Sequence, residues 1–279
     1  MTAEPDAREP VQPKPAATVV LLRDDGPSRE VEVFLVERQR SMGFMGGMHV
    51  FPGGKVSVGD TSTALQARIV DREHGARAEP WGHGVDAAAA AARAVAAIRE
   101  TFEEAGVLLA KDCASADLAA MRERLLAGED LAALLEHFGL WLELSLLQPL
   151  ARWITPAREP VRFDTSFYLA RLPTGQVAGH EEKESASGLW LSPSRALEAS
   201  QAGRIRLAPP TARTLETLLF ASSVDAAFEA VAARPLPVVL PVMRTVGDQL
   251  VILYPGDPEH PEPKRALDGP TRYVFRRDM

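Results

Sequence analysis

The stretch 86–106 constrains this fold more than any other part of the chain. Residues 87–105 contain no proline or glycine, begin with an alanine run and end in an acidic turn. Asp86 is a residue type that accepts hydrogen bonds from the free amides at a helix N-terminus. A glycine such as Gly106 commonly ends a helix in a left-handed conformation. The sequence therefore predicts one helix over about 87–105.

The carboxylates of this helix gather on one side. At about 100° per residue, Glu100, Glu103 and Glu104 fall within an arc of roughly 100°, and Phe102 lies opposite. Carboxylates at this spacing repel each other, and either protonation of one carboxylate or a bound hard divalent cation would relieve the repulsion. Oxygen ligands favour magnesium, manganese or calcium over zinc. Arg99, four residues before Glu103, is predicted to hold that carboxylate in position. For three glutamates alone, a solvated helix face is the alternative.

Strand-like runs surround the helix. Residues 18–22 and 31–36 are β-branched and aliphatic, and the turn-forming cluster between them predicts a hairpin. A third strand, 48–51, ends at Pro52-Gly53-Gly54. Further strand patterns lie at 151–154, 163–172, 189–191, 238–246, 249–254 and 272–275, and helical patterns at 115–127, 129–138, 193–202, 209–221 and 223–233. This mixture predicts an α/β or α+β domain with helical insertions.

Composition divides the chain into three parts. Residues 1–15 contain four prolines and almost no large apolar group, which predicts a disordered tail. Residues 16–204 form the predicted main domain, with an insertion at about 61–86 and a helical segment at 115–138. Residues 205–279 form a C-terminal extension that we expect to pack on the same domain. With 279 residues, 46% of them hydrophobic, the chain can bury a sizeable core.

Charge and cysteine content exclude several classes of protein. A net charge of −7 argues against nucleic acid or an anionic membrane as the principal partner. No apolar run reaches the roughly 18–20 residues of a membrane helix, and the N-terminus lacks a signal-peptide pattern. Cys113 is the only cysteine, so no disulfide can form within the chain. We expect a cytoplasmic protein, and the sequence leaves a homodimer open.

The order of residues around the helix resembles the box of the Nudix hydrolase family. That box has a glycine, a glutamate six positions later, and then Arg-Glu-apolar-x-Glu-Glu-x-Gly-apolar. Gly54 matches the first glycine, and Asp60 stands at the position of the first glutamate. Residues 99–107 match the second half, although Thr101 stands where an aliphatic residue is usual.

A long insert separates the two halves of the box. The 38 residues 61–98 stand where the family usually has seven, and with 48–54 they are similar to the branch related to peroxisomal coenzyme A diphosphatases. The halves can still meet, because the entropic cost of closing a longer loop grows only logarithmically. Arg38 and Gly47 fit a coenzyme A signature of that branch, but Gly43 stands where the signature has a second arginine. Coenzyme A, ADP-ribose-like and dinucleotide substrates therefore stay open.

The resemblance implies both a fold and an activity. The implied fold is a Nudix-type α/β/α sandwich with a mixed sheet, a helical insertion and a C-terminal extension. The implied activity is Mg²⁺- or Mn²⁺-dependent hydrolysis of a diphosphate linkage in a small nucleoside diphosphate derivative. The implied catalytic residues are Glu103, Glu100, Glu104 and Arg99, and the implied metal ligands are Gly53, through its carbonyl, with Glu100, Glu103 and Glu104.

A general base and cationic substrate contacts complete the expected site. Nudix enzymes often carry a further glutamate in the loop before a segment like Trp190-Leu191-Ser192-Pro193, and Glu182 is favoured over Glu184 for that role. Arginine suits bidentate phosphate recognition. The predicted substrate-binding residues are Arg38, Arg40, Lys55, Arg152 and Arg162. The alternative function is a catalytically silent Nudix-fold module that binds a nucleotide or regulates, which the intact glutamates argue against.

Overall fold

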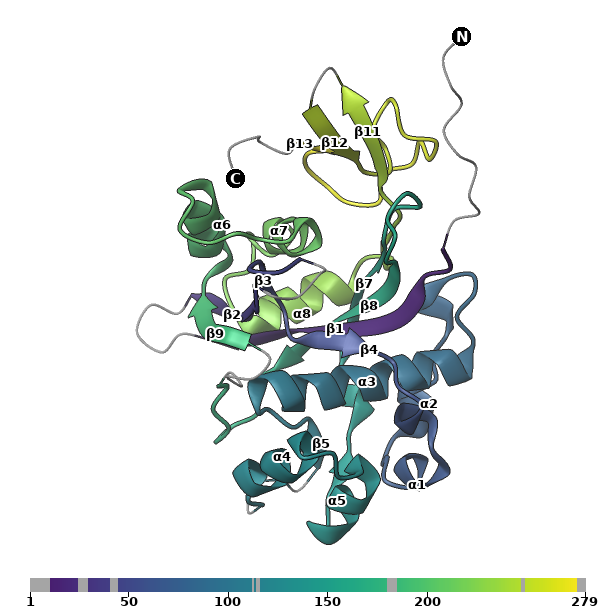
Figure 1. Cartoon of the computed structure of the whole chain (residues 1–279), viewed down its shortest axis with the longest axis vertical. Coiled ribbons are helices and arrows are strands. Elements are labelled where there is room, and N and C mark those ends of the chain that lie inside the picture. Colours follow the sequence, from purple (N-terminus) through teal and green to yellow (C-terminus); the bar gives the residue numbers. More distant parts are fainter. Residues whose placement is uncertain are drawn as a thin grey trace.

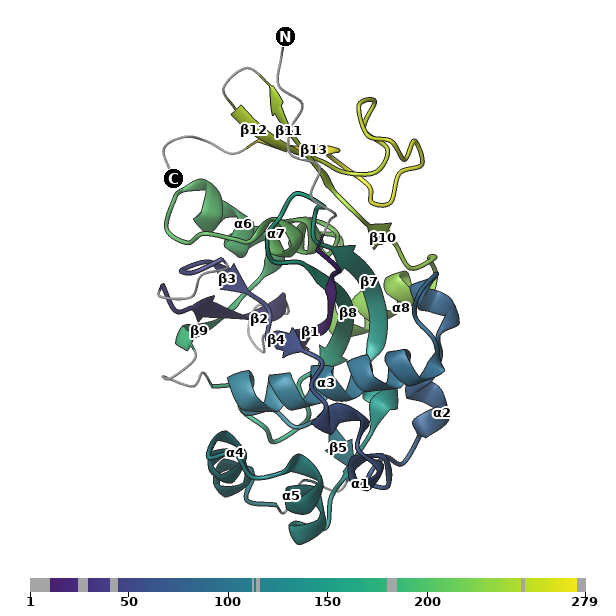
Figure 2. The same ribbon diagram turned by 45° about the vertical axis from the view of Figure 1, so that its right-hand side comes forward.

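A mixed β-sheet lies at the centre of the structure, a computed structural model that describes residues 11–24, 30–40, 45–111, 113, 116–179, 185–246 and 249–274. Its strands are β1 (Lys14–Asp24), β2 (Val31–Arg38), β3 (His49–Val50), β4 (Gly53–Lys55), β7 (Gln148–Ile154), β8 (Phe163–Arg171), β9 (Ser185–Leu191) and β10 (Val238–Val239). They run in the order β10-β7-β8-β1-β2-β3, with β4 paired to β1 and β9 to β2 (Figure 1; β10 is labelled in Figure 2).

The pairing of β1 combines both strand directions. It runs parallel to β8 over the register Lys14↔Phe163 to Leu22↔Arg171, and antiparallel to β2 and β4. The antiparallel β1–β2 pair confirms the predicted hairpin, although its turn lies outside the described residues. β1 begins at Lys14, earlier than the predicted start at 18, because the parallel partner β8 extends the pairing beyond the aliphatic run.

Both faces of the sheet are apolar, and each builds its own core. Successive residues of a strand point to opposite faces. In β1, Val19 and Leu21 belong to one buried cluster, whereas Val20 and Leu22 belong to the other. The alternation continues in β2 and β8, where both faces carry buried residues. A sheet buried on both sides needs helices on both sides.

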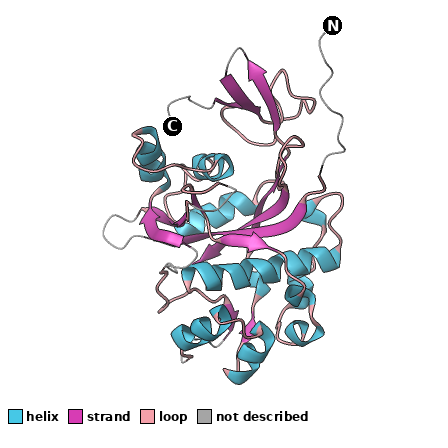
Figure 3. Cartoon of the chain, viewed as in Figure 1, coloured by secondary structure: helices cyan, strands magenta, loops and turns pink. Residues whose placement is uncertain are grey.

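Helices cover both faces. α3 (Ala87–Ala105) lies on one face, with α4 (Leu118–Leu126) and α5 (Leu131–His137) beyond it, and α6 (Pro193–Gln201), α7 (Pro209–Glu216) and α8 (Val224–Ala232) lie on the other (Figures 1 and 2). The layers are distinct when the elements are coloured by type (Figure 3). This arrangement confirms the predicted α/β/α sandwich with a mixed sheet. Among the described helices, none combines the length and apolarity that crossing a bilayer requires.

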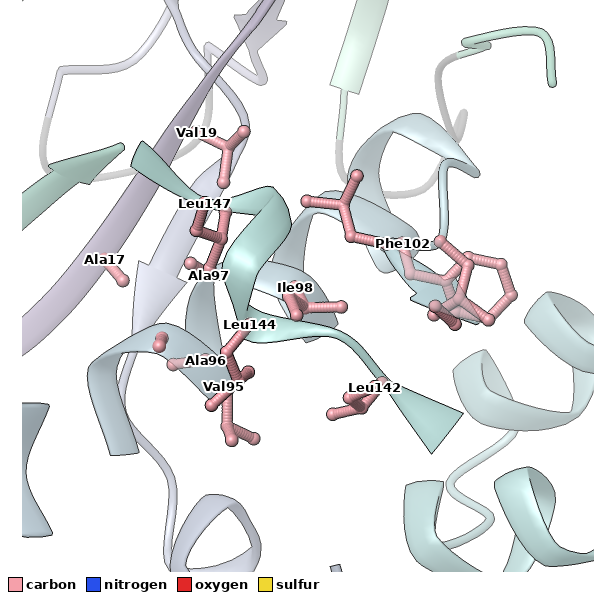
Figure 4. Close-up of a cluster of buried hydrophobic side chains, with 14 of the residues drawn as sticks. Ala17, Val19, Val95, Ala96, Ala97, Ile98, Phe102, Leu142, Leu144 and Leu147 are labelled. Atoms are coloured by element: carbon pink, nitrogen blue, oxygen red, sulfur yellow. The ribbon is translucent and has the colours of Figure 1, made fainter. Parts of the chain in front are cut away.

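α3 has the boundaries that the sequence predicts. The side chain of Asp86 accepts a 2.8 Å hydrogen bond from the amide of Ala89. At the other end Gly106 has a φ of 70°, a left-handed conformation that costs little without a Cβ. Ile98 and Phe102 are fully buried among side chains that include Leu142, Leu144 and Leu147 (Figure 4). The apolar side of α3 therefore fixes the rotation of the helix and hence the direction of its carboxylates.

Short helical turns run from residue 59 through the segment 61–86, and two of them, η1 and α2, contact α3. These are η1 (Gly59–Thr61), α1 (Thr63–Gln66), α2 (Arg72–Gly75) and η2 (Glu79–Trp81). Leu65 and Trp81 are buried, and the Trp81 ring meets Tyr168 of β8 with centroids 5.0 Å apart. A small pair, β5 (Ala110–Lys111) and β6 (Trp141–Leu142), and the turn η4 (Leu144–Leu146) complete this side.

The C-terminal part of the chain contributes to two sheets. β10 pairs parallel with β7 at the edge of the main sheet. β11 (Val242–Val246), β12 (Gln249–Leu253) and β13 (Arg272–Val274) form a separate antiparallel sheet. The single strand predicted over 238–246 is therefore two strands, interrupted where Pro241 has no amide to donate.

Candidate active site

Gly53 and Gly54, which we call the glycine loop, lie directly on the acidic side of α3. β4 pairs with β1 through Thr18↔Gly53 and Ala17↔Gly54, which holds its backbone flat beside the helix. A Cβ added to Gly54 would lie 2.3 Å from the carboxyl carbon of Glu100. A Cβ at Gly53 would lie 2.4 Å from the carbonyl oxygen of Ala17. A side chain at Gly54 would displace the carboxylate of Glu100, and one at Gly53 would push β4 away from β1, so glycine at both positions permits the two halves of the box to meet.

Glu104 connects helix and strand directly. Its Oε2 accepts a 2.9 Å hydrogen bond from the amide of Gly53, and its side chain is buried. Of the predicted catalytic carboxylates, Glu104 is thus the one tied to the glycine loop. Glu100 packs against Gly54, and Glu103 lies on the same side of α3, where both meet the guanidinium of Arg99.

The guanidinium of Arg99 is the hub of the acidic cluster. Its Nε and Nη2 donate to the two carboxylate oxygens of Asp60 at 2.8 and 3.1 Å, and Nη2 also donates to the carbonyl of Lys55 at 2.9 Å. Its Nη1 donates to Glu100 at 2.8 Å and to both oxygens of Glu103 at 3.2 Å. One arginine therefore holds three carboxylates and the end of β4 in fixed relation.

The charge of Arg99 is stabilised by this environment. Burial lowers its pKa, but the hydrogen bond to Asp60 and the negative charges of Glu100, Asp60 and Glu103 outweigh burial and raise the pKa above its usual value. The Asp60 side chain is 0% exposed and also accepts a 2.6 Å hydrogen bond from the amide of Ser57. Asp60, whose part the sequence left open, is thus a buried partner of Arg99.

Sequence reasoning missed Arg122. Its Nε and Nη2 donate to the backbone carbonyl of Glu103 at 3.0 and 2.7 Å. A cation at the C-terminal end of a helix interacts favourably with the helix dipole and the free carbonyls there. The signal was hidden because Arg122 belongs to α4, nineteen positions after Glu103, in a segment that carries no box residue.

The oxygen atoms gathered at this site are suitable ligands for a hard divalent cation. The carboxylates of Glu100 and Glu104 lie beside Gly54 and Gly53, with Glu103 next to them on Arg99, and magnesium and manganese prefer such oxygen ligands. Within the described residues, no three His, Cys, Asp or Glu side chains are already disposed as ligands of one metal ion. The positions of these carboxylates are set by Arg99 and Gly53, and a bound cation would share Glu100 and Glu103 with the guanidinium.

Three of the predicted substrate contacts flank the segment 45–55. Lys55 follows Gly54 and its side chain is exposed. Arg38 ends β2, and its Nε is buried without a hydrogen-bond partner. Arg40 is exposed, and a Cβ built on Gly47 would lie 3.2 Å from the Cγ of Arg40. Lys55 and Arg40 are thus exposed and Arg38 is half-buried around the segment that leads into the glycine loop.

Arg152 has a structural role in place of the substrate contact that the sequence suggested. Its Nε and Nη2 bind the carboxylate of Asp164 at 2.8 Å each, and its Nη1 donates to the carbonyls of Trp81 and His83 at 2.7 and 2.8 Å. Arg93 of α3 binds the same carboxylate at 2.6 Å. Burial raises the pKa of Asp164, but the hydrogen bonds from the two arginines outweigh it and lower the pKa.

Arg162 is likewise occupied within the protein. It is buried, and it donates to the carbonyls of Thr155 and Val11 at 3.0 and 2.7 Å. It therefore ties the start of the described chain to β7 and β8. The predicted general base, Glu182, and its alternative, Glu184, lie outside the described residues, as does Gly43.

Comparison with known proteins agrees with this geometry. A family model described as the NUDT19 Nudix domain matches residues 76–218. The acyl-coenzyme A diphosphatase NUDT19 of Gallus gallus is 31% identical over 304 residues, which cover 88% of this chain and 79% of that protein. The Homo sapiens protein of the same name is 26% identical over 272 residues, covering 83% and 72%.

A solved structure shares both the fold and part of the sequence. The NUDIX hydrolase from Alicyclobacillus acidocaldarius superposes with a TM-score of 0.61 at 29% identity, covering 78% of this chain and 96% of that one. Together with the glycine loop on the acidic helix, these matches show that the chain is an enzyme that belongs to the Nudix hydrolase family.

Proposed function

We propose that this enzyme hydrolyses the diphosphate linkage of a coenzyme A-type nucleoside diphosphate derivative and that it requires Mg²⁺ or Mn²⁺. The observation that carries the proposal is the contact of Gly53 and Gly54 with Glu104 and Glu100. The substrate class is supported by relatives that are named acyl-coenzyme A diphosphatase. Both parts are open to direct test.

The proposed metal ligands are the carboxylates of Glu100, Glu103 and Glu104 with the carbonyl of Gly53. When bound, a divalent cation would supply an activated water and neutralise charge on the phosphates. The proposed role of Arg99 is to hold Glu100 and Glu103 side by side, because a catalytic group displaced by about 1 Å can lose roughly a hundredfold in rate.

The remaining polar roles are assigned by the chemistry of the side chains. Glu182 is the proposed general base that takes the proton of the attacking water. Lys55, next to the glycine loop, is proposed to bind an oxygen of the diphosphate, where an ammonium acts as a point charge. Arg38 and Arg40 are proposed to bind the substrate beside the segment 45–55, further from the glycine loop than Lys55.

We keep the division of the chain as a proposal: a tail at 1–15, although Lys14 and Pro15 belong to β1, a Nudix domain at 16–204 and an extension at 205–279 on the same domain. A cytoplasmic location is proposed on the single cysteine of the chain, which suits a reducing compartment. A homodimer is the remaining open proposal, to be checked by light scattering on the purified chain.

A substrate panel tests the proposed function. The full chain is incubated with MgCl₂ and coenzyme A, ADP-ribose, NADH or nucleoside triphosphates, and products are separated by anion-exchange chromatography. We expect coenzyme A to be split into a 4′-phosphopantetheine and an adenosine bisphosphate, with no turnover in excess EDTA. Preferred hydrolysis of ADP-ribose or NADH would replace the substrate class. No product from any of them at high enzyme would favour the catalytically silent module.

A further inference from the structure

A cavity of about 230 Å³ lies beside β7, near the edge of the main sheet. Its walls come from the insert, from β7 and β8, and from the end of α8 with the segment that follows it, residues 231–236. In the sheet, β8 and β1 separate β7 from β4 (Figure 2). At about 4.8 Å between neighbouring strands, β7 and β4 lie roughly 14 Å apart. The cavity is therefore separate from the glycine loop.

Most of the cavity wall is apolar. It includes the buried rings of Trp81 and Tyr168, whose centroids lie 5.0 Å apart, and the side chains of Leu144, Leu147 and Leu236. A cavity of about 150 Å³ holds a molecule the size of benzene. This one therefore has room for a ring or short chain that carries a small substituent, and a bare inorganic ion would gain nothing from these walls.

The titratable side chains at the cavity are basic or phenolic. Arg77 and Arg234 line it together with His74, and no acidic side chain lines it among the residues that the structure describes. A concave surface with cations of one sign and apolar walls attracts anions, because the field is concentrated where little water screens it. The charge of the lining therefore favours a ligand with a negative group.

Arg234 lacks a partner that would balance its charge. Its Nε and Nη2 are buried and have no hydrogen-bond partner within the described chain. Burial lowers the pKa of Arg234, and the negative charge of Asp268 offsets only part of that effect. A second void, of about 10 Å³, beside Arg234 and Trp153 has room for about one water, which would bring no charge. Since buried charges are normally paired, an anion in the cavity would supply what Arg234 lacks.

We propose that this cavity binds a small organic monocarboxylate, with its apolar body against Trp81 and Tyr168 and its carboxylate paired with Arg234. The apolar walls select the hydrocarbon body, and the guanidinium selects the carboxylate, with which arginine forms strong charged hydrogen bonds. None of the described residues that line the cavity belongs to the acidic cluster or to the glycine loop. This site therefore goes beyond the proposed function and does not depend on it.

Binding of defined probes tests the site. Benzoate and hexanoate are the probes, benzamide and hexanamide are their uncharged counterparts, and inorganic phosphate is an anion without an apolar body. Dissociation constants are measured by ligand-observed NMR on the full chain in excess EDTA, so that no metal ion attracts the carboxylates elsewhere. We expect a Kd of roughly 1 mM for both carboxylates, as for a fragment of about nine non-hydrogen atoms. The amides should bind at least about tenfold more weakly, because the charged hydrogen bond is lost.

Two further measurements locate the ligand. Arg234→Gln should weaken both carboxylates to the level of the amides, whereas Arg204→Gln, at an exposed position that does not line the cavity, should leave them unchanged. In the ¹H–¹⁵N spectrum, the indole signal of Trp81 is assigned by its absence in Trp81→Phe. This signal should shift during the titration, and that of Trp141, which does not line the cavity, should stay in place.

Several outcomes would overturn the proposed site. These are equal binding of carboxylates and amides, unchanged binding by Arg234→Gln, or no binding of either carboxylate at ten times the expected Kd. Tighter binding of phosphate than of both carboxylates would overturn the ligand class. Thermal melting checks that Arg234→Gln is folded. If it is not, Arg77→Gln at an exposed position replaces it and must weaken the carboxylates alone, with the Trp81 signal still shifting in the wild type.

Discussion

The amide of Gly53 donates a 2.9 Å hydrogen bond to Oε2 of Glu104, and this bond fixes the start of β4 against the last turn of α3. The two residues are 51 positions apart, with the whole insert between them. Their contact therefore aligns the two halves of the box. A substitution that breaks this alignment should lower the catalytic rate.

Substitution of Gly54 by alanine should damage the site without unfolding the protein. The added Cβ would lie 2.3 Å from the carboxyl carbon of Glu100, so the side chain or β4 must shift. A displacement of this size is expected to reduce kcat/KM by about ten- to a hundredfold. Gly59→Ala is the matched control, because its Cβ would meet only Ser57 Oγ at 3.6 Å. Equal activity of the two variants would count against the arrangement.

Glu103→Gln should retain the fold and lose at least about two orders of magnitude in kcat. The amide oxygen can still accept from Nη1 of Arg99, so the change mainly removes a negative charge. Glu229→Gln on α8, across the sheet and exposed, serves as the control. Rates are compared across a Mg²⁺ titration. Unchanged turnover at every magnesium concentration would remove Glu103 from the mechanism.

Arg99→Gln should destabilise the fold as well as the site. Without the guanidinium, the fully buried carboxylate of Asp60 loses its charge partner, a change that typically costs about 3–5 kcal/mol. Urea denaturation measures the free energy of unfolding. Adding Asp60→Asn to Arg99→Gln should recover part of this loss, because the unpaired buried charge is then gone. A double variant no more stable than Arg99→Gln would show that the charge of Asp60 is not the cause.

The network of Asp257 predicts a pH dependence of stability. Hydrogen bonds from Arg272 lower the pKa of Asp257 from 3.8 to about 2, outweighing the effect of burial. A carboxyl whose pKa is lowered on folding stabilises the protein above its unfolded pKa and loses that contribution as pH falls through the folded value. The difference in unfolding free energy between wild type and Asp257→Asn should therefore shrink between pH 4 and pH 2. A difference independent of pH would contradict this.

Local signals in the sequence identified α3, its caps and its acidic side, because a helix and its ends depend on residues within a few positions of one another. The same reasoning failed for Arg152, whose partners Asp164 and Trp81 become visible only when β7, β8 and the insert pack together. Arg122 carried no local signal either, since it meets the carbonyl of Glu103 only when α4 packs against the end of α3. Spacing within a motif can be read from the sequence, whereas contacts between different elements become known only when the elements pack together.

β10 has a consequence for how the chain tolerates truncation. This two-residue strand covers β7 at Arg152 and Trp153 and closes that border of the main sheet. Uncovered strand borders present free amides and carbonyls that pair with other molecules. A chain shortened to end before residue 238 would keep its catalytic helix and glycine loop but would expose β7 to edge-to-edge association, so it should fail first through aggregation and only secondarily through lost chemistry.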